Sequence, residues 1–193
     1  MDRAWLLTWT TYGTRLPGDE RGTVGNVVDW AGRHRRNAPG TAAAAGLRGL
    51  VADAASTMRG PPVWLTTDHA PLLLTQFQET AAHRGWFLTA VAVVSNHVHV
   101  VVGVRGDPEP DTLLRDFKSY GSRQLNRSFG SPEGGTWWTH GGSTRKLPDD
   151  EAVRAATAYV EQQVNPLIVW SVHTPGSGTP GGALRGTAGE PPA

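Results

Sequence analysis

The sequence predicts an α+β domain in which helices pack on a mostly antiparallel sheet, an order of elements compatible with the ferredoxin-like arrangement. Strand-like and helix-like segments follow one another as strand, helices, strand, strand, helix, short strand, helix. Two of the strands, at 86–94 and 97–104, are separated by only two residues, which predicts a hairpin. At 193 residues the chain is long enough for one domain of ordinary size and short for two.

The first third of the chain predicts one strand, one long loop and one helix. Residues 4–12 are rich in aromatic and β-favouring side chains and are expected to form a strand. Residues 13–40 are dominated by Gly, Pro, Asp and Arg, so a loop is expected. Residues 42–58 carry apolar side chains at helical spacing and predict a helix. We therefore expect an insertion of loop and helix over about 14–60.

The rest of the chain predicts alternating helices and strands before a flexible tail. In order, these are a helix at about 66–83, the two hairpin strands, a helix at about 111–127, a short strand or ordered loop within 136–146 and a helix at about 149–164. The segment 174–193 is rich in Gly and Pro and is expected to be flexible. A single domain is therefore expected over 1–173.

The composition excludes several classes of protein. The chain contains no cysteine, so a disulfide scaffold, a cysteine nucleophile and a thiolate zinc site are excluded. It has no apolar run long enough to span a bilayer, and its first residues lack the apolar core of a signal peptide. We therefore expect a cytoplasmic protein with no membrane partner.

The net charge of +1 argues against a nucleic-acid partner only until it is resolved along the chain. Residues 112–146 carry six basic residues against two acids, and residues 1–60 carry eight arginines against five acids. The remaining segments are acidic. The pattern predicts a localised basic groove rather than a uniformly basic surface.

Two histidines in the second hairpin strand form a candidate metal site. Side chains two residues apart in a strand point to the same face, so His97 and His99 project together. The valines at 98, 100, 102 and 104 then face the opposite side, where they are expected to be buried. Two imidazoles side by side make a good pair of metal ligands. Taken alone, the pair also fits two hydrogen-bonded structural histidines.

A tyrosine in the next predicted helix is a candidate nucleophile. Tyr120 and Gln124 are four residues apart, so their side chains are neighbours on the helix surface. Basic residues surround the tyrosine in the sequence, and a tyrosine in such a setting can attack a phosphate. The alternative is a structural tyrosine that packs its ring in the core and leaves its hydroxyl at the rim.

These residues carry a family resemblance. The stretch NHVHVVV at 96–102, followed by DFKSYGSRQLNR at 116–127, resembles the HUH motif and catalytic tyrosine of the REP-associated tyrosine transposases. These proteins are part of the insertion-sequence 200 type of HUH single-tyrosine transposases. Stretches at 7–22, 60–66 and 137–147 are also similar to that family. The resemblance implies an HUH-endonuclease fold, with a ferredoxin-like (RRM-like) antiparallel sheet.

The resemblance also implies an activity. Such a protein nicks and rejoins single-stranded DNA near hairpin, REP-like sequences through a 5′-phosphotyrosine intermediate. Tyr120 would be the nucleophile, and His97, His99 and Gln124 would hold Mg²⁺ or Mn²⁺. Relatives act either as homodimers with shared sites or as monomers, and both states remain open at this point.

Arginines and lysines in the two basic segments are the candidate DNA contacts, because single-strand grooves combine positive charge with aromatic stacking surfaces. They are Arg33, Arg35 and Arg36 in the early loop and Arg115, Lys118, Arg123, Arg127, Arg145 and Lys146 around the site. Trp137 and Trp138 are candidate stacking groups.

Two other functions remain as alternatives. One is a catalytically silent or domesticated DNA-binding derivative of the same family. The other is an unrelated HxH metalloenzyme such as a cupin-like oxygenase. That class usually has a glutamate shortly after the histidine pair, whereas position 104 is Val and the first acid after His99 is Asp107.

Overall fold

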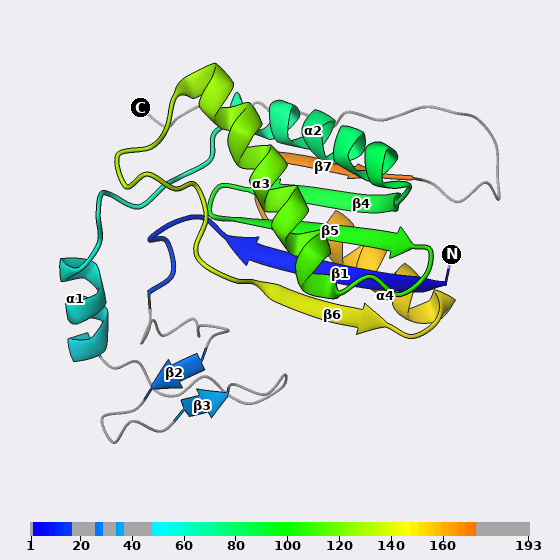
Figure 1. Ribbon diagram of the computed structural model, residues 1–193, viewed down its shortest axis with the longest axis horizontal. Helices are drawn as coiled ribbons and strands as arrows, with labels where there is room; N and C mark the ends of the chain where they lie inside the picture. Colours follow the sequence, from blue (N-terminus) through cyan, green and yellow to red (C-terminus); the bar gives the residue numbers. More distant parts are fainter. Residues whose placement is uncertain (1, 17–25, 29–33, 37–47, 173–193) are drawn as a thin grey trace.

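The computed structural model describes residues 2–16, 26–28, 34–36 and 48–172 (Figure 1). Its centre is a five-stranded antiparallel sheet with the strand order β6-β1-β5-β4-β7. The strands are β1 (Arg3–Thr10), β4 (Phe87–Val94), β5 (His97–Val104), β6 (Ser143–Leu147) and β7 (Ile168–Ser171). The strand β5 that carries both histidines is therefore central in the sheet.

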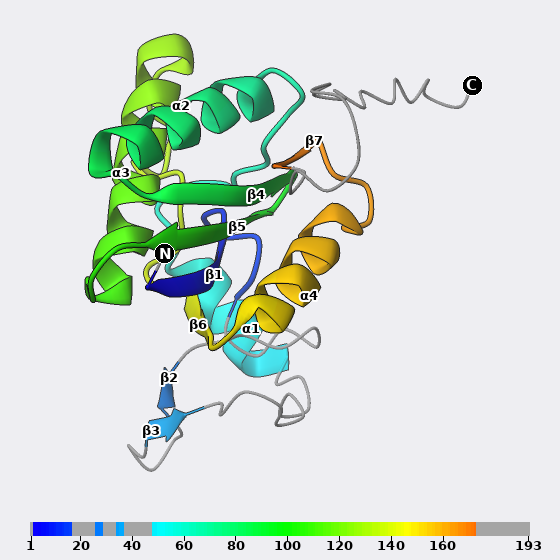
Figure 2. The same cartoon turned by 90° about the vertical axis from the view of Figure 1, so that its right-hand side faces the viewer.

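Helices cover both faces of this sheet. The helices are α1 (Arg48–Ser56), α2 (His69–Arg84), α3 (Pro110–Phe129) and α4 (Asp150–Glu161). Figures 1 and 2 show α2 and α3 on one face and α4 on the other. In chain order β1, α2, β4, β5, α3 and β6 give the strand order β6-β1-β5-β4, which confirms the predicted ferredoxin-like α+β fold.

Two parts of the predicted element map need correction, and two others lie partly or wholly outside the described residues. The stretch 13–40, expected to be a loop, contains a two-stranded antiparallel ribbon of β2 (Asn26–Val28) and β3 (His34–Arg36). Of the helix expected at 42–58, the structure contains α1 (Arg48–Ser56), and residues 42–47 lie outside the described part of the chain. The strand β7, which pairs with β4 and extends the sheet, was not predicted. Four residues after a Pro are too few for a period-two pattern to be visible. The predicted tail at 174–193 lies outside the described residues.

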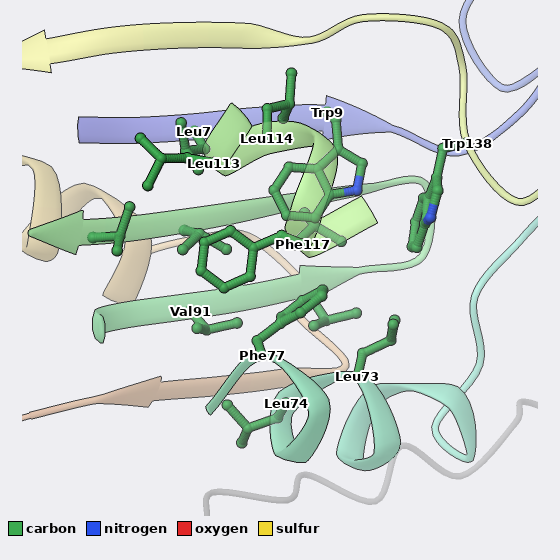
Figure 3. Close-up of a cluster of buried hydrophobic side chains, with 14 of the residues drawn as sticks. Leu7, Trp9, Leu73, Leu74, Phe77, Val91, Leu113, Leu114, Phe117 and Trp138 are labelled. Atoms are coloured by element: carbon green, nitrogen blue, oxygen red, sulfur yellow. The ribbon is translucent and has the colours of Figure 1, made fainter. Parts of the chain in front are cut away.

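The face under α2 and α3 holds the larger apolar core. Alternation along the paired strands sends Leu7, Trp9, Val98 and Val100 to this side, where all four are at most 1% exposed. Aromatic rings from both helices pack edge-on above them, and Phe77 is the central ring of this stack (Figure 3). Its ring centroid lies 5.7 Å from that of Trp9 and 5.6 Å from that of Phe117.

The face under α4 holds a smaller core made mainly of small side chains. Ala156 and Val160 of the helix pack on a floor of strand residues that includes Ala4, Ala90 and Ala92. The side chain of Asp149 caps the start of the helix by accepting a hydrogen bond from the Ala152 backbone N–H. Both histidines belong to this face because they alternate with the valines of β5. Among the described residues, no helix is long and apolar enough to cross a membrane.

Candidate functional site

His97 and His99 lie side by side on the α4 face, as the sequence predicts. Their ring centroids are 4.7 Å apart, and the rings are nearly perpendicular at 83°. His99 is 4% exposed, while His97 is half-buried toward the end of the strand. The pair therefore forms the floor of a site that opens at one end of the sheet.

A separate neighbour orients each imidazole through its Nδ1 atom. His97 Nδ1 donates a hydrogen bond to Asn96 Oδ1 at 2.6 Å, and this leaves a lone pair on His97 Nε2. His99 Nδ1 shares a hydrogen bond of 2.7 Å with Thr8 Oγ1, from the paired strand β1. The Nε2 atom of His99 is buried and has no hydrogen-bond partner in the described part of the chain. Both Nε2 atoms are therefore available to a ligand inside the site.

The end of α4 supplies the other two groups of the site. The ring of Tyr159 meets the ring of His99 edge-on, with centroids 5.3 Å apart, although half of the tyrosine side chain is exposed. Four residues later, Gln163 Oε1 lies 3.4 Å from His97 Nε2. The four side chains therefore come together from two elements, β5 and the C-terminal end of α4.

The amide of Gln163 is held with its oxygen toward the histidines, because its Nε2 donates to the Tyr159 backbone carbonyl at 3.0 Å. With Nδ1 of His97 acting as a donor to Asn96, Gln163 Oε1 and His97 Nε2 face each other as two lone-pair donors. Two such atoms repel one another unless a proton or a cation lies between them. The arrangement therefore suits a bound cation.

Burial keeps both imidazoles in the neutral form that binds metals. It lowers the pKa of His99 to about 4, and the neighbouring His97 adds to this effect. The pKa of His97 is also lowered, mainly by burial, with a smaller contribution from the positive charge of Arg15. At neutral pH, neither ring therefore needs to lose a proton before it binds a cation.

These atoms fit a divalent cation. Its ligands would be His97 Nε2, His99 Nε2 and Gln163 Oε1. The observation that favours a cation here is the buried Nε2 atom of His99, which has no hydrogen-bond partner among the described residues. The hydrogen bonds made by the two Nδ1 atoms are of the kind that usually orients metal-binding histidines. Among the described residues, no cluster of three or more His, Asp or Glu side chains supplies another such site.

The predicted grouping of Tyr120 and Gln124 with the histidines is corrected by the structure. Both residues lie on α3, which packs on the valine face of the sheet, opposite the histidines (Figure 2). The ring of Tyr120 lies instead under the guanidinium of Arg123, with Cζ 5.0 Å from the ring centroid. Gly121 faces α2, since a Cβ there would lie 3.1 Å from Leu73 and 3.2 Å from Phe77.

The sequence contained a signal for the residues that were missed. Tyr159 and Gln163 have the same four-residue spacing as Tyr120 and Gln124, and they fall in the last predicted helix and just after it. Spacing alone gives no preference between the two pairs. The face of the sheet that each helix covers decides which pair meets the histidines.

The predicted DNA contacts are distributed over several surfaces. Arg115, Arg123 and Arg127 are exposed on α3, away from the histidine face. Arg145 and Lys146 are exposed on the edge strand β6. Arg35 and Arg36 belong to β3, where only the backbone is described, and Arg33 lies outside the described residues. None of these contacts is tested by the structure, and they stay predictions.

Lys118 and the two tryptophans, which were expected to contact DNA, make hydrogen bonds within the protein instead. Lys118 Nζ donates to the backbone carbonyls of Thr139 at 2.7 Å and Gly141 at 2.6 Å, and burial lowers its pKa to about 8. Trp137 and Trp138 are 6% and 5% exposed. Their indole N–H groups donate to Asn126 Oδ1 and to the Lys118 carbonyl. These contacts fasten the 136–142 loop to α3, so the two indoles are core residues rather than stacking surfaces.

The fold and the paired-histidine site agree with a comparison that places the chain among the transposases. The family described as IS200-like transposases matches residues 62–163, which is more than half of the chain, and the chain belongs to this family. The matched segment contains both histidines, Tyr159 and Gln163. A search of curated proteins finds no match.

Two similar solved structures also carry transposase descriptions. A REP-associated tyrosine transposase bound to a REP hairpin is 12% identical, with a TM-score of 0.47 over 82% of this chain and 64% of that one. A transposase candidate from Deinococcus radiodurans R1 is 19% identical, with a TM-score of 0.40 over 86% of this chain and 94% of that one. The chain thus spans less than two thirds of the first structure. Both TM-scores are below 0.5, so the fold described above rests on this chain's own strand order.

Proposed function

We propose that this protein is a metal-assisted, single-stranded DNA endonuclease and strand transferase in which Tyr159, rather than Tyr120, is the nucleophile. The observation that carries the proposal is the meeting of Tyr159 and Gln163 with His97 and His99 at one open end of the sheet. The family assignment supplies the reaction class, which is DNA transposition.

The proposed chemistry is an exchange of phosphodiester bonds. The phenolic oxygen of Tyr159 attacks a backbone phosphorus and gives up its proton to solvent water. The bond from phosphorus to the 3′-oxygen breaks, and that oxygen takes a proton from water to leave a free 3′-hydroxyl. The DNA is then joined to Tyr159 through its 5′-phosphate. Attack by another 3′-hydroxyl reverses the step and joins two strands, so no external energy source is needed.

His97, His99 and Gln163 would hold Mg²⁺ or Mn²⁺ beside the reacting phosphate. When bound there, the cation supplies positive charge that stabilises the charge developing on the phosphate oxygens. Asn96 and Thr8 orient the two imidazoles, and the Tyr159 carbonyl orients the Gln163 amide. The half-exposed ring of Tyr159 leaves its hydroxyl accessible to a strand that enters from solvent.

The first substrate to test is single-stranded DNA beside a hairpin. The stretches at 96–102 and 137–147 resemble REP-associated transposases, and hairpins of the REP type flank the DNA on which such proteins act. Covalent capture tests the reaction itself. The full-length protein is incubated with Mn²⁺ and a pool of labelled hairpin-flanked oligonucleotides, and adducts that survive denaturing electrophoresis are measured.

Two tyrosine variants make this experiment specific. Tyr159→Phe is expected to abolish the adduct, with at least about a thousandfold loss of cleavage, because no other oxygen replaces the nucleophile. Tyr120→Phe, on the opposite face of the sheet, is expected to retain the adduct. Retention by Tyr159→Phe with loss in Tyr120→Phe would overturn the assignment. Binding without any adduct in the wild type would favour the catalytically silent alternative.

A further inference from the structure

Helix α4 leaves one corner of its face of the sheet uncovered. Leu6 and Ala92 are buried beneath the helix at 8% and 0% exposure. Toward the open end, Thr8, Thr10 and Ser143 are only partly buried. The register pairs Thr8 with both His99 and Ser143, so these residues form one continuous floor with the histidines. The floor consists of hydroxyl and imidazole groups and contains no carboxylate, as suits an anionic strand.

Arg145 lies at the rim of this corner on the edge strand β6. It pairs with Leu6, which faces α4, and residues paired across strands share a face of the sheet. The next residue, Lys146, pairs with Trp5 and therefore belongs to the opposite face. Arg145 lies two strands across the sheet from His99 and two residues along, which puts their Cα atoms roughly 12 Å apart. In the described part of the chain, no carboxylate forms an ion pair with Arg145.

Arg15 lies on the other side of the histidines. The turn after β1 is fastened to the carbonyl of Asn96, which accepts from the Thr11 backbone N–H at 2.9 Å and from the Thr14 hydroxyl at 3.4 Å. Arg15 directly follows Thr14, and His97 directly follows Asn96, so these hydrogen bonds bring Arg15 near His97. The side chain of Arg15 is half-buried, and no ion pair to it is found among the described residues. A half-buried cation without a carboxylate favours an anionic ligand.

We infer that Arg15 and Arg145 bind backbone phosphates of the DNA strand on the two sides of the paired histidines. The strand then crosses the uncovered corner from the turn after β1 to the edge strand β6. Its path passes over the floor that contains Thr8 and below the hydroxyl of Tyr159. This inference rests on the proposed function, since it names the strand path for the same site. It also separates Arg145 from Lys146, which the sequence alone had grouped together.

The test measures binding apart from cleavage. A short fluorescein-labelled single strand of mixed sequence is titrated against full-length Tyr159→Phe protein by fluorescence anisotropy, over a range of NaCl concentrations. Arg15→Gln, Arg145→Gln or Lys146→Gln is then added to that protein. Arg145 and Lys146 are adjacent, exposed and on opposite faces, so their variants change charge equally and differ only in the face affected.

Each phosphate contact to a single strand contributes about 0.7 to the slope of log affinity against log salt. We expect Arg15→Gln and Arg145→Gln each to lower that slope by about 0.7 and to weaken binding about tenfold at low salt. Lys146→Gln should change the slope by less than about 0.2. Arg15→Lys should keep the slope, because it keeps the charge.

Two results overturn the inference. One is an equal loss in Arg145→Gln and Lys146→Gln, which would mean that charge acts without regard to face. The other is an unchanged slope in Arg15→Gln and Arg145→Gln. If the wild type forms no adduct with DNA while Arg145→Gln and Lys146→Gln still differ in binding, the proposed enzyme activity fails and the strand path is supported.

Discussion

At the scale of single residues, the site depends on the groups that hold the imidazoles from behind. Thr8 and Asn96 bond the two Nδ1 atoms, which lie across each imidazole ring from Nε2, the atom that would meet a ligand. The register of β1 against β5 fixes Thr8 opposite His99. The sheet therefore orients His99 before any ligand binds, and binding requires little rearrangement.

Removing the hydroxyl behind His99 tests this orientation. Thr8→Val keeps the β-branched shape but removes the hydrogen bond to His99 Nδ1, and we expect Mn²⁺ affinity to fall about 10- to 100-fold. Titration of free Mn²⁺ by electron paramagnetic resonance measures it. Thr10→Val is the matched control, since Thr10 pairs with His97 and its hydroxyl has no hydrogen bond in the described residues. Equal losses in both variants would show that Thr8 has no specific role.

At the scale of elements, helix placement decides which tyrosine meets the histidines. The ferredoxin-like order puts α2 and α3 on the same face, and the strongly apolar side of β5 is the face that two helices must cover. The valines of β5, alternating with the histidines, thus indicated that α3 lies away from His97 and His99. Both faces of β5 were predictable from its residues, whereas the expected grouping of Tyr120 with the histidines left out which face α3 covers. The helix that ends near Tyr159 is expected from the sequence, whereas its side of the sheet is a tertiary property.

The contact between α2 and α3 gives a stability prediction. Gly121→Val would place side-chain atoms against Leu73 and Phe77, which a Cβ alone already approaches to 3.1–3.2 Å. We expect the free energy of unfolding to fall by about 2–3 kcal/mol from overpacking. Urea denaturation measures it, with Ser128→Val, an exposed position on the same helix, as the control for adding a valine side chain to this helix. Valine has a higher helix propensity than glycine, so a loss at position 121 reflects packing. A loss no larger than that of the control would contradict the close packing.

The loop from 136 to 142 gives a prediction about pH. Burial lowers the pKa of Lys118 to about 8 from the usual 10.5, so between these values the folded protein holds fewer protons than the unfolded chain. The free energy of unfolding therefore rises with pH across this window. After a discount for partial exposure, we expect wild type to gain about 1–2 kcal/mol over Lys118→Met between pH 8 and 10.5. Denaturation of both proteins at the two pH values measures it, and a constant difference would argue against the shift.

At the scale of the whole molecule, the two faces of the sheet have separate roles. The α2 and α3 face holds the larger core, and the α4 face holds the smaller core and the candidate site. The fold class, both histidines and the helical segments at 66–83, 111–127 and 149–164 were predictable from residue patterns. The ribbon of β2 and β3 and the strand β7 were not, because three or four residues carry too little periodicity.

The meeting of Tyr159 with the histidines of its own chain predicts that one polypeptide makes a complete site. Mixing Tyr159→Phe with His99→Ala should therefore restore no adduct, because neither chain holds both halves of the site. The mixture is assayed by covalent capture beside each variant alone. Recovery toward about a quarter of wild-type activity would show instead that the site is shared between two subunits, because half of the dimers would be mixed and each would have one intact site.

The alternation of histidine and valine at the start of β5, over residues 97–100, has a consequence for how the protein folds. If β5 paired with β1 one residue out of step, every side chain would change face. The imidazoles would enter the larger apolar core under α2 and α3, where a buried polar nitrogen without a hydrogen-bond partner costs about 1–3 kcal/mol. A mispaired strand would therefore lose stability and its candidate site together. Selection for a folded protein would thus also preserve the geometry of the histidine pair, even in a descendant that no longer moves DNA.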